Sequence, residues 1–233
     1  MDETIAVLIP IKSFNEAKER LSETLNKSER SLLMKKMAEN VINSSATLPI
    51  WVVCDDDEVA LWAESKNVSV IRTGETGLNA AVKVGVETLE KNGFSKVIIA
   101  HADLPNAENL QRCAEFEGVT IVQDHKGDGT PVLVIPTHKG FRFSYGPGSF
   151  SSHTLEAERL NLPHRQLFAP KLSFDVDEPE DLKVVTGIID FFWKNLDLSL
   201  IHISEPTRLL SISYSVVWLK KKRGGGGGGG GGG

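Results

Sequence analysis

The chain has 233 residues, 40% hydrophobic and 24% charged, a composition typical of a globular protein with a single domain. Its net charge of −5 gives no electrostatic basis for binding nucleic acid, and no stretch reaches the roughly 18 apolar residues of a membrane span. Cys54 and Cys113 lack metal-ligand spacing and are interpreted as reduced, buried thiols, which favours a cytoplasmic protein. We expect no signal peptide, because Asp2 and Glu3 precede an apolar run that is too short.

Apolar, β-rich runs alternate with segments of helical periodicity through residues 1–197. Strands are predicted at Ile5–Ile9, Ile50–Cys54, Val68–Ile71, Val97–Ala100, Thr120–Val122, Val132–Ile135 and Leu172–Phe174. Helices are predicted at Ser28–Ser44, Asp57–Lys66, Leu78–Asn92, Ala107–Phe116, Phe150–Leu160 and Pro179–Phe192, with Ser28 as an N-cap. This alternation predicts one α/β domain, a three-layer sandwich whose mostly parallel sheet is covered on both faces. Such sheets bind ligands at the carboxyl ends of their strands.

Residues 198–233 are predicted to lie outside this domain. Their first part, "LSLIHISEPTR", resembles the conceptual translation of a transposase-type sequencing adapter, and Gly224–Gly233 resembles the translated homopolymer G read that follows one. We therefore expect a non-native tail that adds no function, and a native C-terminus that is missing; a genuine apolar segment with a flexible glycine tail is the alternative. Without this tail, residues 1–197 hold 21 Lys and Arg against 30 Asp and Glu, a net charge of −9.

Carboxylates follow two of the predicted strands. Asp103 comes after "VIIAHA", and Asp175 and Asp177 come after "LSF". Because Asp175 and Asp177 are two residues apart, both point to one side of an extended segment. Carboxylates at strand ends are the hard oxygen ligands that Mg²⁺ prefers, although Asp177 alone is equally suited to cap a helix beginning at Pro179. The three together favour a metal site.

Three cations follow the first strand in this acidic chain: Lys12, Lys18 and Arg20. Phosphoryl transfer places Lys and Arg on phosphate oxygens, where they stabilise the charge that grows on the leaving group. The alternative is a solvated helix start in which Glu16 and Glu19 are the partners. Beside the carboxylates, the phosphate-binding interpretation is favoured.

Glycine-bearing turns supply further candidate ligand contacts. The turn "GPGS", Gly146–Ser149, precedes a helix, so its backbone N–H groups are able to hold an anion. The turn "GDGT", Gly127–Thr130, ends in a hydroxyl, and Asn79 in "TGLNAAVKVG" is expected to contact a base or ribose, or to cap a helix. The chain has no Walker loop, no Gly-x-Gly-x-x-Gly fingerprint and no Gly-x-Ser-x-Gly elbow.

Short motifs occur along the chain in the following order: "IPIKSFNEAKERL", "GLNAAVKVG", "HADLP", "GDGT", "YGPGSF" followed by His153, and "DVDEPEDL". Over residues 4 to about 185 this order resembles the 2-phospho-L-lactate guanylyltransferase family, which includes the phosphoenolpyruvate guanylyltransferases of deazaflavin coenzyme biosynthesis. The resemblance implies a nucleotide-diphospho-sugar transferase-like fold. It also implies transfer of GMP from GTP to a phosphorylated three-carbon acid (2-phospho-L-lactate, phosphoenolpyruvate or 3-phosphoglycerate), with release of pyrophosphate.

The same resemblance implies a role for each candidate residue. The acid would be held by Thr130, Gly146 and Ser149, the Mg²⁺ by Asp103, Asp175 and Asp177, the triphosphate by the catalytic cations Lys12, Lys18 and Arg20, and the nucleoside by Gly77 and Asn79. The family often has Asn after the Thr of "GDGT", whereas this chain has Pro131, which lacks a backbone N–H and leaves the exact acid open. The ionised substrate phosphate would attack the α-phosphorus in line, so neither a protein nucleophile nor a general base is required. His101 and His153 are expected to be structural or to contact substrate.

Two other classes of function stay open. A nucleotidyltransferase acting on a sugar phosphate or the molybdenum cofactor would carry a glycine-rich loop after the first strand, which this chain lacks. A non-catalytic GTP-binding module would not need three carboxylates and three cations together. The expected partners are GTP and a small phosphorylated acid, with no nucleic acid and no membrane, and homodimerisation is left open.

Overall fold

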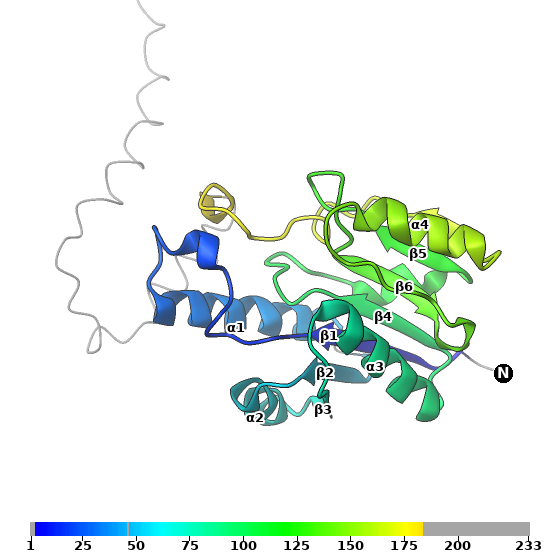
Figure 1. Cartoon of the computed structure of the whole chain (residues 1–233), viewed down its shortest axis with the longest axis horizontal. Coiled ribbons are helices and arrows are strands. Elements are labelled where there is room, and N and C mark those ends of the chain that lie inside the picture. Colours follow the sequence, from blue (N-terminus) through cyan, green and yellow to red (C-terminus); the bar gives the residue numbers. More distant parts are fainter. Residues whose placement is uncertain (1–2, 46, 184–233) are drawn as a thin grey trace, which may run out of the picture. The chain divides into compact units, whose positions relative to one another are not determined.

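A seven-stranded sheet forms the centre of the protein (Figure 1). The computed structural model describes residues 3–45 and 47–183. The strands are β1 (Ile5–Pro10), β2 (Ile50–Cys54), β3 (Ser69–Arg72), β4 (Lys96–Ala100), β5 (Val119–Val122), β6 (Val132–Pro136) and β7 (His164–Gln166). Their order across the sheet is β3-β2-β1-β4-β6-β5-β7.

Most strand pairs are parallel, as predicted. Strand β1 pairs in parallel with β2 and β4, β2 with β3, and β5 with β7. Strand β6 runs antiparallel to both β4 and β5. Parallel pairing sends the carboxyl ends of β1 to β4 to one edge, and the reversed β6 begins at that same edge, where Val132 pairs with Ala100. Loops from distant parts of the chain therefore meet there.

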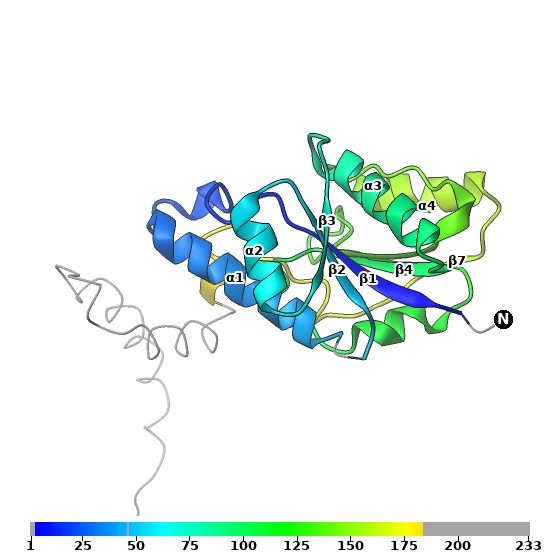
Figure 2. The same cartoon turned by 90° about the horizontal axis from the view of Figure 1, so that it is seen from below.

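The four α-helices of the described residues cover the two faces of the sheet (Figure 2). They are α1 (Lys27–Asn43), α2 (Asp57–Ser65), α3 (Leu78–Lys91) and α4 (Ser149–Arg159). Successive side chains of β1 alternate between two apolar cores, Val7 and Ile9 packing on the side of α1 and α2, and Ala6 and Leu8 on the side of α3 and α4. The three-layer sandwich predicted from the sequence is thus confirmed. No helix within the described part of the chain is long and apolar enough to cross a membrane.

The predicted strands match the structure except at the last one. Residues Leu172 to Phe174 are not a strand, because the backbone N–H groups of Leu172 and Ser173 both donate to the carbonyl of Ala169 and close a turn. The seventh strand is instead β7, whose sequence "HRQ" has no apolar pattern. It forms at the sheet edge through backbone pairing with β5.

Two helix predictions also need correction. The segment Ala107–Phe116 was expected to be an α-helix, but it contains only the 3₁₀-helix Leu110–Glu115, which Asn109 precedes in the left-handed conformation at φ 52°. The first helix is capped by Asn26 and not by Ser28: the Asn26 side chain accepts from the N–H of Glu29, and the Glu29 carboxylate accepts from the N–H of Asn26.

The C-terminal predictions fall largely outside the described residues. Of the helix predicted at Pro179–Phe192, the described part shows the 3₁₀-helix Asp181–Lys183. The predicted tail, residues 198–233, lies outside the described residues altogether.

Candidate active site

A cavity of about 510 Å³ opens at the sheet edge where the carboxyl ends of β1 and β4 lie. The loop after β1 and the loop after β4 form most of its wall, and Asp177 contributes from the C-terminal side of the domain. The charged side chains around it include all three predicted cations and two of the three predicted metal ligands: Lys12, Lys18, Arg20, Asp103 and Asp177. The fold therefore brings together residues that lie more than 150 positions apart in the sequence.

Three carboxylates meet at this edge. One oxygen each from Asp103, Asp175 and Asp177 lies within 4.8 Å of the other two, although Asp103 follows β4 and the others follow the turn at Ala169. Desolvation, reinforced by the charges of Asp103 and Asp177, raises the pKa of Asp175 to about 6. The Oδ1 atom of Asp103 is buried and has no hydrogen-bond partner among the described residues. Oxygen donors in this arrangement fit a hard divalent cation such as Mg²⁺.

Lys18 is the cation nearest this triad. Its Nζ lies 2.6 Å from Oδ2 of Asp103 and 2.7 Å from Oδ1 of Asp177, and its side chain is only 8% exposed. Burial alone would lower the pKa of Lys18, but the two carboxylates outweigh it and raise the pKa, so the ammonium group stays charged. Its backbone adopts the left-handed conformation at φ 58°, which is unfavourable for Lys. One positive charge against three carboxylates leaves negative charge uncompensated.

Lys12 and Arg20 lie on the same cavity wall but face solvent. Their side chains are 79% and 74% exposed. Lys12 pairs with Glu16 at 2.9 Å, and Arg20 pairs with Glu178 at 3.9 Å. Exposed ion pairs of this kind contribute little to stability, so both cations are able to change partners when a ligand enters. The structure thus separates the three predicted cations into one buried lysine and two exposed groups.

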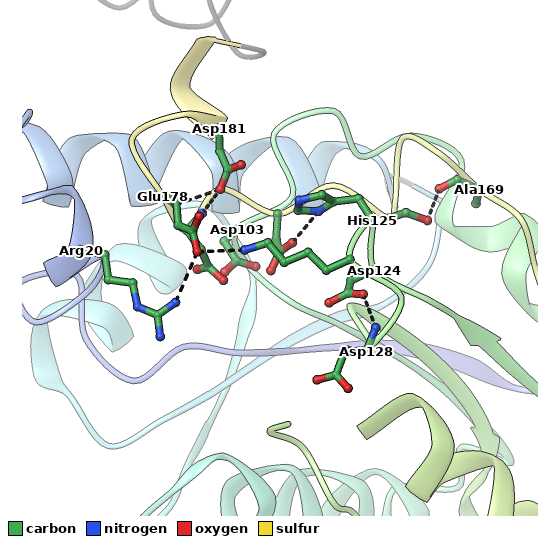
Figure 3. A network of polar contacts seen from close by, with 12 residues as sticks. Arg20, Asp103, Asp124, His125, Asp128, Ala169, Glu178 and Asp181 are labelled. Carbon is green, nitrogen blue, oxygen red and sulfur yellow. Dashed lines mark hydrogen bonds and ion pairs between the residues drawn. The ribbon is translucent and has the colours of Figure 1, made fainter. Parts of the chain in front are cut away.

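Glu178 joins Arg20 to a second cation that the sequence analysis missed. Its Oε1 also lies 3.3 Å from Nζ of Lys126, a residue of the loop between β5 and β6. The carboxylate of Asp181 accepts from the backbone N–H of Asp177 at 2.9 Å and of Glu178 at 2.8 Å. Figure 3 shows this network, with Arg20 and Asp181 on opposite sides of Glu178. Asp181 therefore orients the segment that carries a predicted metal ligand.

The loop between β5 and β6 closes the other side of the triad. The ring atom Nδ1 of His125 lies 3.4 Å from Oδ1 of Asp175. The backbone N–H of His125 donates to the carbonyl of Ser173 at 2.7 Å. Asp124 accepts from the N–H of Asp128 at 2.8 Å within this loop (Figure 3). A Cβ at position 129 would lie 2.5 Å from Oδ2 of Asp124, so any residue other than Gly129 requires this carboxylate to shift. The sequence analysis did not single out His125, which stands two positions before the first glycine of "GDGT".

The predicted acid ligands Thr130 and Ser149 lie in a buried polar cluster. Both are 2% exposed, and Ser149 Oγ donates to Thr130 Oγ1 at 3.3 Å. His153 Nδ1 lies 3.2 Å from the same Thr130 oxygen, and His153 Nε2 accepts from the N–H of Ser144 at 3.1 Å. Since Nε2 is an acceptor, the neutral ring carries its proton on Nδ1. Desolvation lowers the pKa of His153 to about 4, with a smaller contribution from His101.

The hydroxyls of this cluster satisfy one another and do not line the 510 Å³ cavity. Their contact with an acid substrate therefore stays a prediction. Gly146, the third predicted acid ligand, is exposed at φ 125° in the turn before α4. Two backbone N–H groups near the start of α4, those of Gly148 and Phe150, donate to Asp128, at 2.9 Å to its Oδ2 and at 3.0 Å to its carbonyl. Asp128 thus occupies part of the predicted anion site.

Asn79 forms a reciprocal pair with a backbone unit. Its Oδ1 accepts from the N–H of Tyr145 at 2.6 Å, and its Nδ2 donates to the Tyr145 carbonyl at 3.2 Å. The pair ties the start of α3 to the turn before α4, so contact of Asn79 with a nucleoside stays a prediction. Gly77 is the N-cap of α3 at φ 92°, a conformation that favours glycine, and it lines a second cavity of about 180 Å³. Its predicted nucleoside contact is likewise untested.

Two buried polar atoms next to these clusters have no hydrogen-bond partner among the described residues. They are Nε2 of His101 and Oη of Tyr145, whose rings lie 5.2 Å apart. Tyr145 also packs edge-on against His153, with ring centroids 4.8 Å apart. Burial lowers the pKa of His101 and raises the pKa of Tyr145, so both rings are neutral. Aromatic packing therefore connects the cavity wall at His101 to the buried hydroxyl cluster.

Sequence comparison places this geometry in a family. The family model described as "Guanylyl transferase CofC like" matches residues 5–188. The chain belongs to this family. A 2-phospho-L-lactate guanylyltransferase from Methanosphaera stadtmanae is 33% identical over 186 residues, covering 76% of this chain and 82% of the relative. A phosphoenolpyruvate guanylyltransferase from Chloroflexus aggregans is 29% identical over 192 residues, covering 77% of this chain and 95% of the relative.

Solved structures support the fold assignment. A putative nucleotide-diphospho-sugar transferase from Desulfovibrio desulfuricans G20 superposes with a TM-score of 0.64 at 16% identity, covering 84% of this chain and 90% of that one. The 4-diphosphocytidyl-2C-methyl-D-erythritol synthase from Anaerococcus prevotii gives a TM-score of 0.55 at 10% identity, covering 81% and 96%. At these identities the likeness shows the fold alone, which is the nucleotide-diphospho-sugar transferase-like fold expected from the sequence.

Proposed function

We propose that the protein transfers GMP from GTP to a phosphorylated three-carbon acid and releases pyrophosphate, as a cytoplasmic step of deazaflavin coenzyme biosynthesis. One observation carries the proposal: a member of a guanylyl transferase family has a cluster of three carboxylates, two of which line one cavity together with a buried lysine and two exposed cations. The named relatives act on 2-phospho-L-lactate or phosphoenolpyruvate, which share a phosphate and a carboxylate on three carbons.

In this proposal Asp103, Asp175 and Asp177 hold Mg²⁺. The triad fits the ion because its oxygens lie within 4.8 Å of one another, and because one buried oxygen of Asp103 has no partner among the described residues. The bound ion would neutralise charge on the phosphate oxygens and help to orient them. Lys18 would then exchange its carboxylate partners for phosphate oxygens, which an ammonium group on a flexible stem is able to do.

The reaction itself needs positioning more than acid–base chemistry. The phosphate of the acid is ionised at neutral pH, so it attacks the α-phosphorus of GTP without a general base. Lys12 and Arg20 would hold the oxygens of the departing pyrophosphate, where negative charge grows in the transition state. The turn at Gly146 would hold the acid, with Thr130 and Ser149 behind it and His153 fixing their geometry.

The test is a pyrophosphate-release assay with GTP and each of the three candidate acids. We expect release with at least one acid, and no release with sugar 1-phosphates or without added Mg²⁺. Release with a sugar phosphate and no acid would instead favour the other transferase class. Tight GTP binding without pyrophosphate release from any acceptor would favour a non-catalytic GTP-binding module.

A matched pair of lysines tests the cavity assignment. Lys12 and Lys83 are both exposed and both pair with a Glu four residues later, but only Lys12 lines the cavity. Lys12→Ala and Arg20→Ala should each slow kcat about 10- to 100-fold, the equivalent of one charge-assisted hydrogen bond made in the transition state. Lys83→Ala should leave kcat unchanged. Equal effects of Lys12→Ala and Lys83→Ala would contradict the assignment.

A further inference from the structure

The second cavity, of about 180 Å³, adjoins the first at the ends of β1, β2 and β3 and at the start of α3. The two cavities share the residues Pro10, Ile11, Lys12 and Leu78 in their walls. A nucleoside attached to phosphates in the larger cavity would therefore reach the smaller one. Apolar side chains form much of its wall, among them Ile11, Val53, Leu78 and Ala81, as the flat faces of a base require.

Two acidic residues line this cavity, Asp55 and Glu75. Neither carboxylate makes a hydrogen bond or an ion pair with the described residues. The three acidic residues that follow Asp55 all have partners. Asp56 caps α2 at the N–H of Val59. Asp57 pairs with Arg72, and Glu58 pairs with Lys35. The carboxylates of Asp55 and Glu75 are thus free to meet a ligand in this cavity, unlike those of Asp56, Asp57 and Glu58.

An unpaired carboxylate next to a triphosphate opposes binding of that anion, because like charges repel at short range. The repulsion is offset where the carboxylate meets hydrogen-bond donors of the same ligand. Guanine presents two adjacent donors, N1–H and the N2 amino group, which match the two oxygens of one carboxylate. Adenine and cytosine present an unprotonated ring nitrogen at the corresponding place, which a carboxylate repels.

The local structure favours Glu75 as the residue that meets these donors. Its backbone N–H donates to Oγ1 of Thr73 at 3.1 Å, and the N–H of the buried Thr73 donates to the carbonyl of Cys54 at 3.1 Å. Glu75 is therefore anchored to the end of the sheet, two residues before Gly77 at the start of α3. Its side chain is one methylene longer than that of Asp55, so it reaches further across the cavity.

We propose that Glu75 is a specificity-determining residue, whose carboxylate accepts hydrogen bonds from N1–H and the N2 amino group of guanine. The inference rests on the proposed function, since it takes GTP as the nucleotide donor. Asp55 would face the same cavity from the end of β2 without contacting this edge of the base. Selection of guanine over other bases would then depend on one side chain that the sequence motifs did not single out.

The experiment compares GTP with ITP, which lacks only the N2 amino group, and with ATP. The enzymes are wild type, Glu75→Ala, Asp55→Ala and the control Glu90→Ala, which removes an equal charge from an exposed position of α3 outside both cavities. Wild type should prefer GTP over ITP in kcat/KM by about 10- to 100-fold, the equivalent of one hydrogen bond to a charged group. Glu75→Ala should reduce this preference to below about threefold, with most of the loss on GTP.

Three results would overturn the proposal: wild type with no preference for GTP over ITP, a preference that survives in Glu75→Ala, or one that collapses in Asp55→Ala alone. Equilibrium binding of GTP and ITP to each variant gives the same comparison without turnover. If no variant, wild type included, released pyrophosphate with any acceptor, the proposed function would fail, and the binding ratios would still decide the role of Glu75. Thermal melting confirms that each variant is folded.

Discussion

The carboxylate triad and the hydroxyl cluster both lie at the same edge of the sheet, yet their polar groups are balanced differently. Within the described residues one lysine, Lys18, pairs with Asp103 and Asp177, while Asp175 lies beside His125, so negative charge remains uncompensated. The cluster formed by Thr130, Ser149 and His153 is neutral, and its members make hydrogen bonds to one another. The triad thus carries unmatched negative charge, whereas the cluster carries no charge that a ligand would have to match.

This difference predicts a binding role for the carboxylate triad and a positioning role for the hydroxyl cluster. Buried charge that the protein leaves unmatched is costly, so it persists where a ligand supplies the missing partner. Buried hydroxyls that satisfy one another stabilise the surrounding backbone and do not require a ligand. Substitutions in the triad should therefore affect activity first, and substitutions in the cluster should affect stability first.

The largest expected effect is on turnover in Asp103→Asn. Loss of this carboxylate should weaken the proposed metal site and lower kcat by about 10²- to 10³-fold, as removal of one electrostatic contact in an active site typically does. The melting temperature should stay within about 4 °C of wild type, because one repulsive charge is also removed. Asp57→Asn, at an exposed position, is the control. More than a tenth of wild-type activity in Asp103→Asn would contradict the metal assignment.

The second prediction concerns the stability of Lys18→Met. Removal of this buried cation leaves three carboxylates facing one another, which should lower the free energy of unfolding by about 3–5 kcal/mol. Added MgCl₂ should restore part of this loss, because a divalent cation replaces the missing charge. Urea unfolding with and without MgCl₂ measures both effects, and Lys83→Met, at an exposed lysine of α3, is the control. A loss that MgCl₂ leaves unchanged would argue against a cation site here.

The third prediction is a pH dependence in the hydroxyl cluster. The folded-state pKa of His153 is lowered to about 4 from its usual 6.5, so the unfolded chain takes up this proton first as the pH falls. The stabilisation from the neutral ring is fully present above pH 6.5 and is lost progressively as the pH falls towards 4. The total loss in the free energy of unfolding is roughly 2–3 kcal/mol. In urea unfolding, the free energy of unfolding of His153→Gln should fall less steeply than that of wild type over this pH interval. The control His164→Gln should fall as steeply as wild type. Equal slopes in wild type and His153→Gln would refute the assignment.

The smallest effect is expected in Tyr145→Phe. The Tyr145 hydroxyl is buried without a partner among the described residues, and such a group carries an uncompensated desolvation cost. Its removal should raise the free energy of unfolding by about 1 kcal/mol, since the ring and its packing on His101 and His153 are kept. Chemical unfolding of the two proteins measures the difference. A loss of stability would mean that the hydroxyl has a partner, such as a bound water molecule.

Several details of the fold could be predicted because they depend on local chemistry. The strand at Ile50–Cys54 and the helix beginning at Leu78 match the structure, since apolar periodicity reports which face of an element is buried. The strand β7 could not be predicted, because "HRQ" is polar and becomes a strand only through backbone pairing with β5. The cap at Asn26 was present in the sequence as "NKSE", but the helical pattern alone did not separate it from Ser28 two positions later.

The sequence by itself determined the α/β class, six of the seven strands and the residues able to bind metal and phosphate, because these follow from periodicity and side-chain chemistry. Only the tertiary structure decided which of those residues share a site. It placed Lys18 on Asp103 and Asp177, at a sequence separation of 159 from the latter, and it placed Thr130 and Ser149 in a buried cluster away from the cavity. Contacts between such distant residues depend on where the strands end in space. These residues become neighbours only when the sheet has formed.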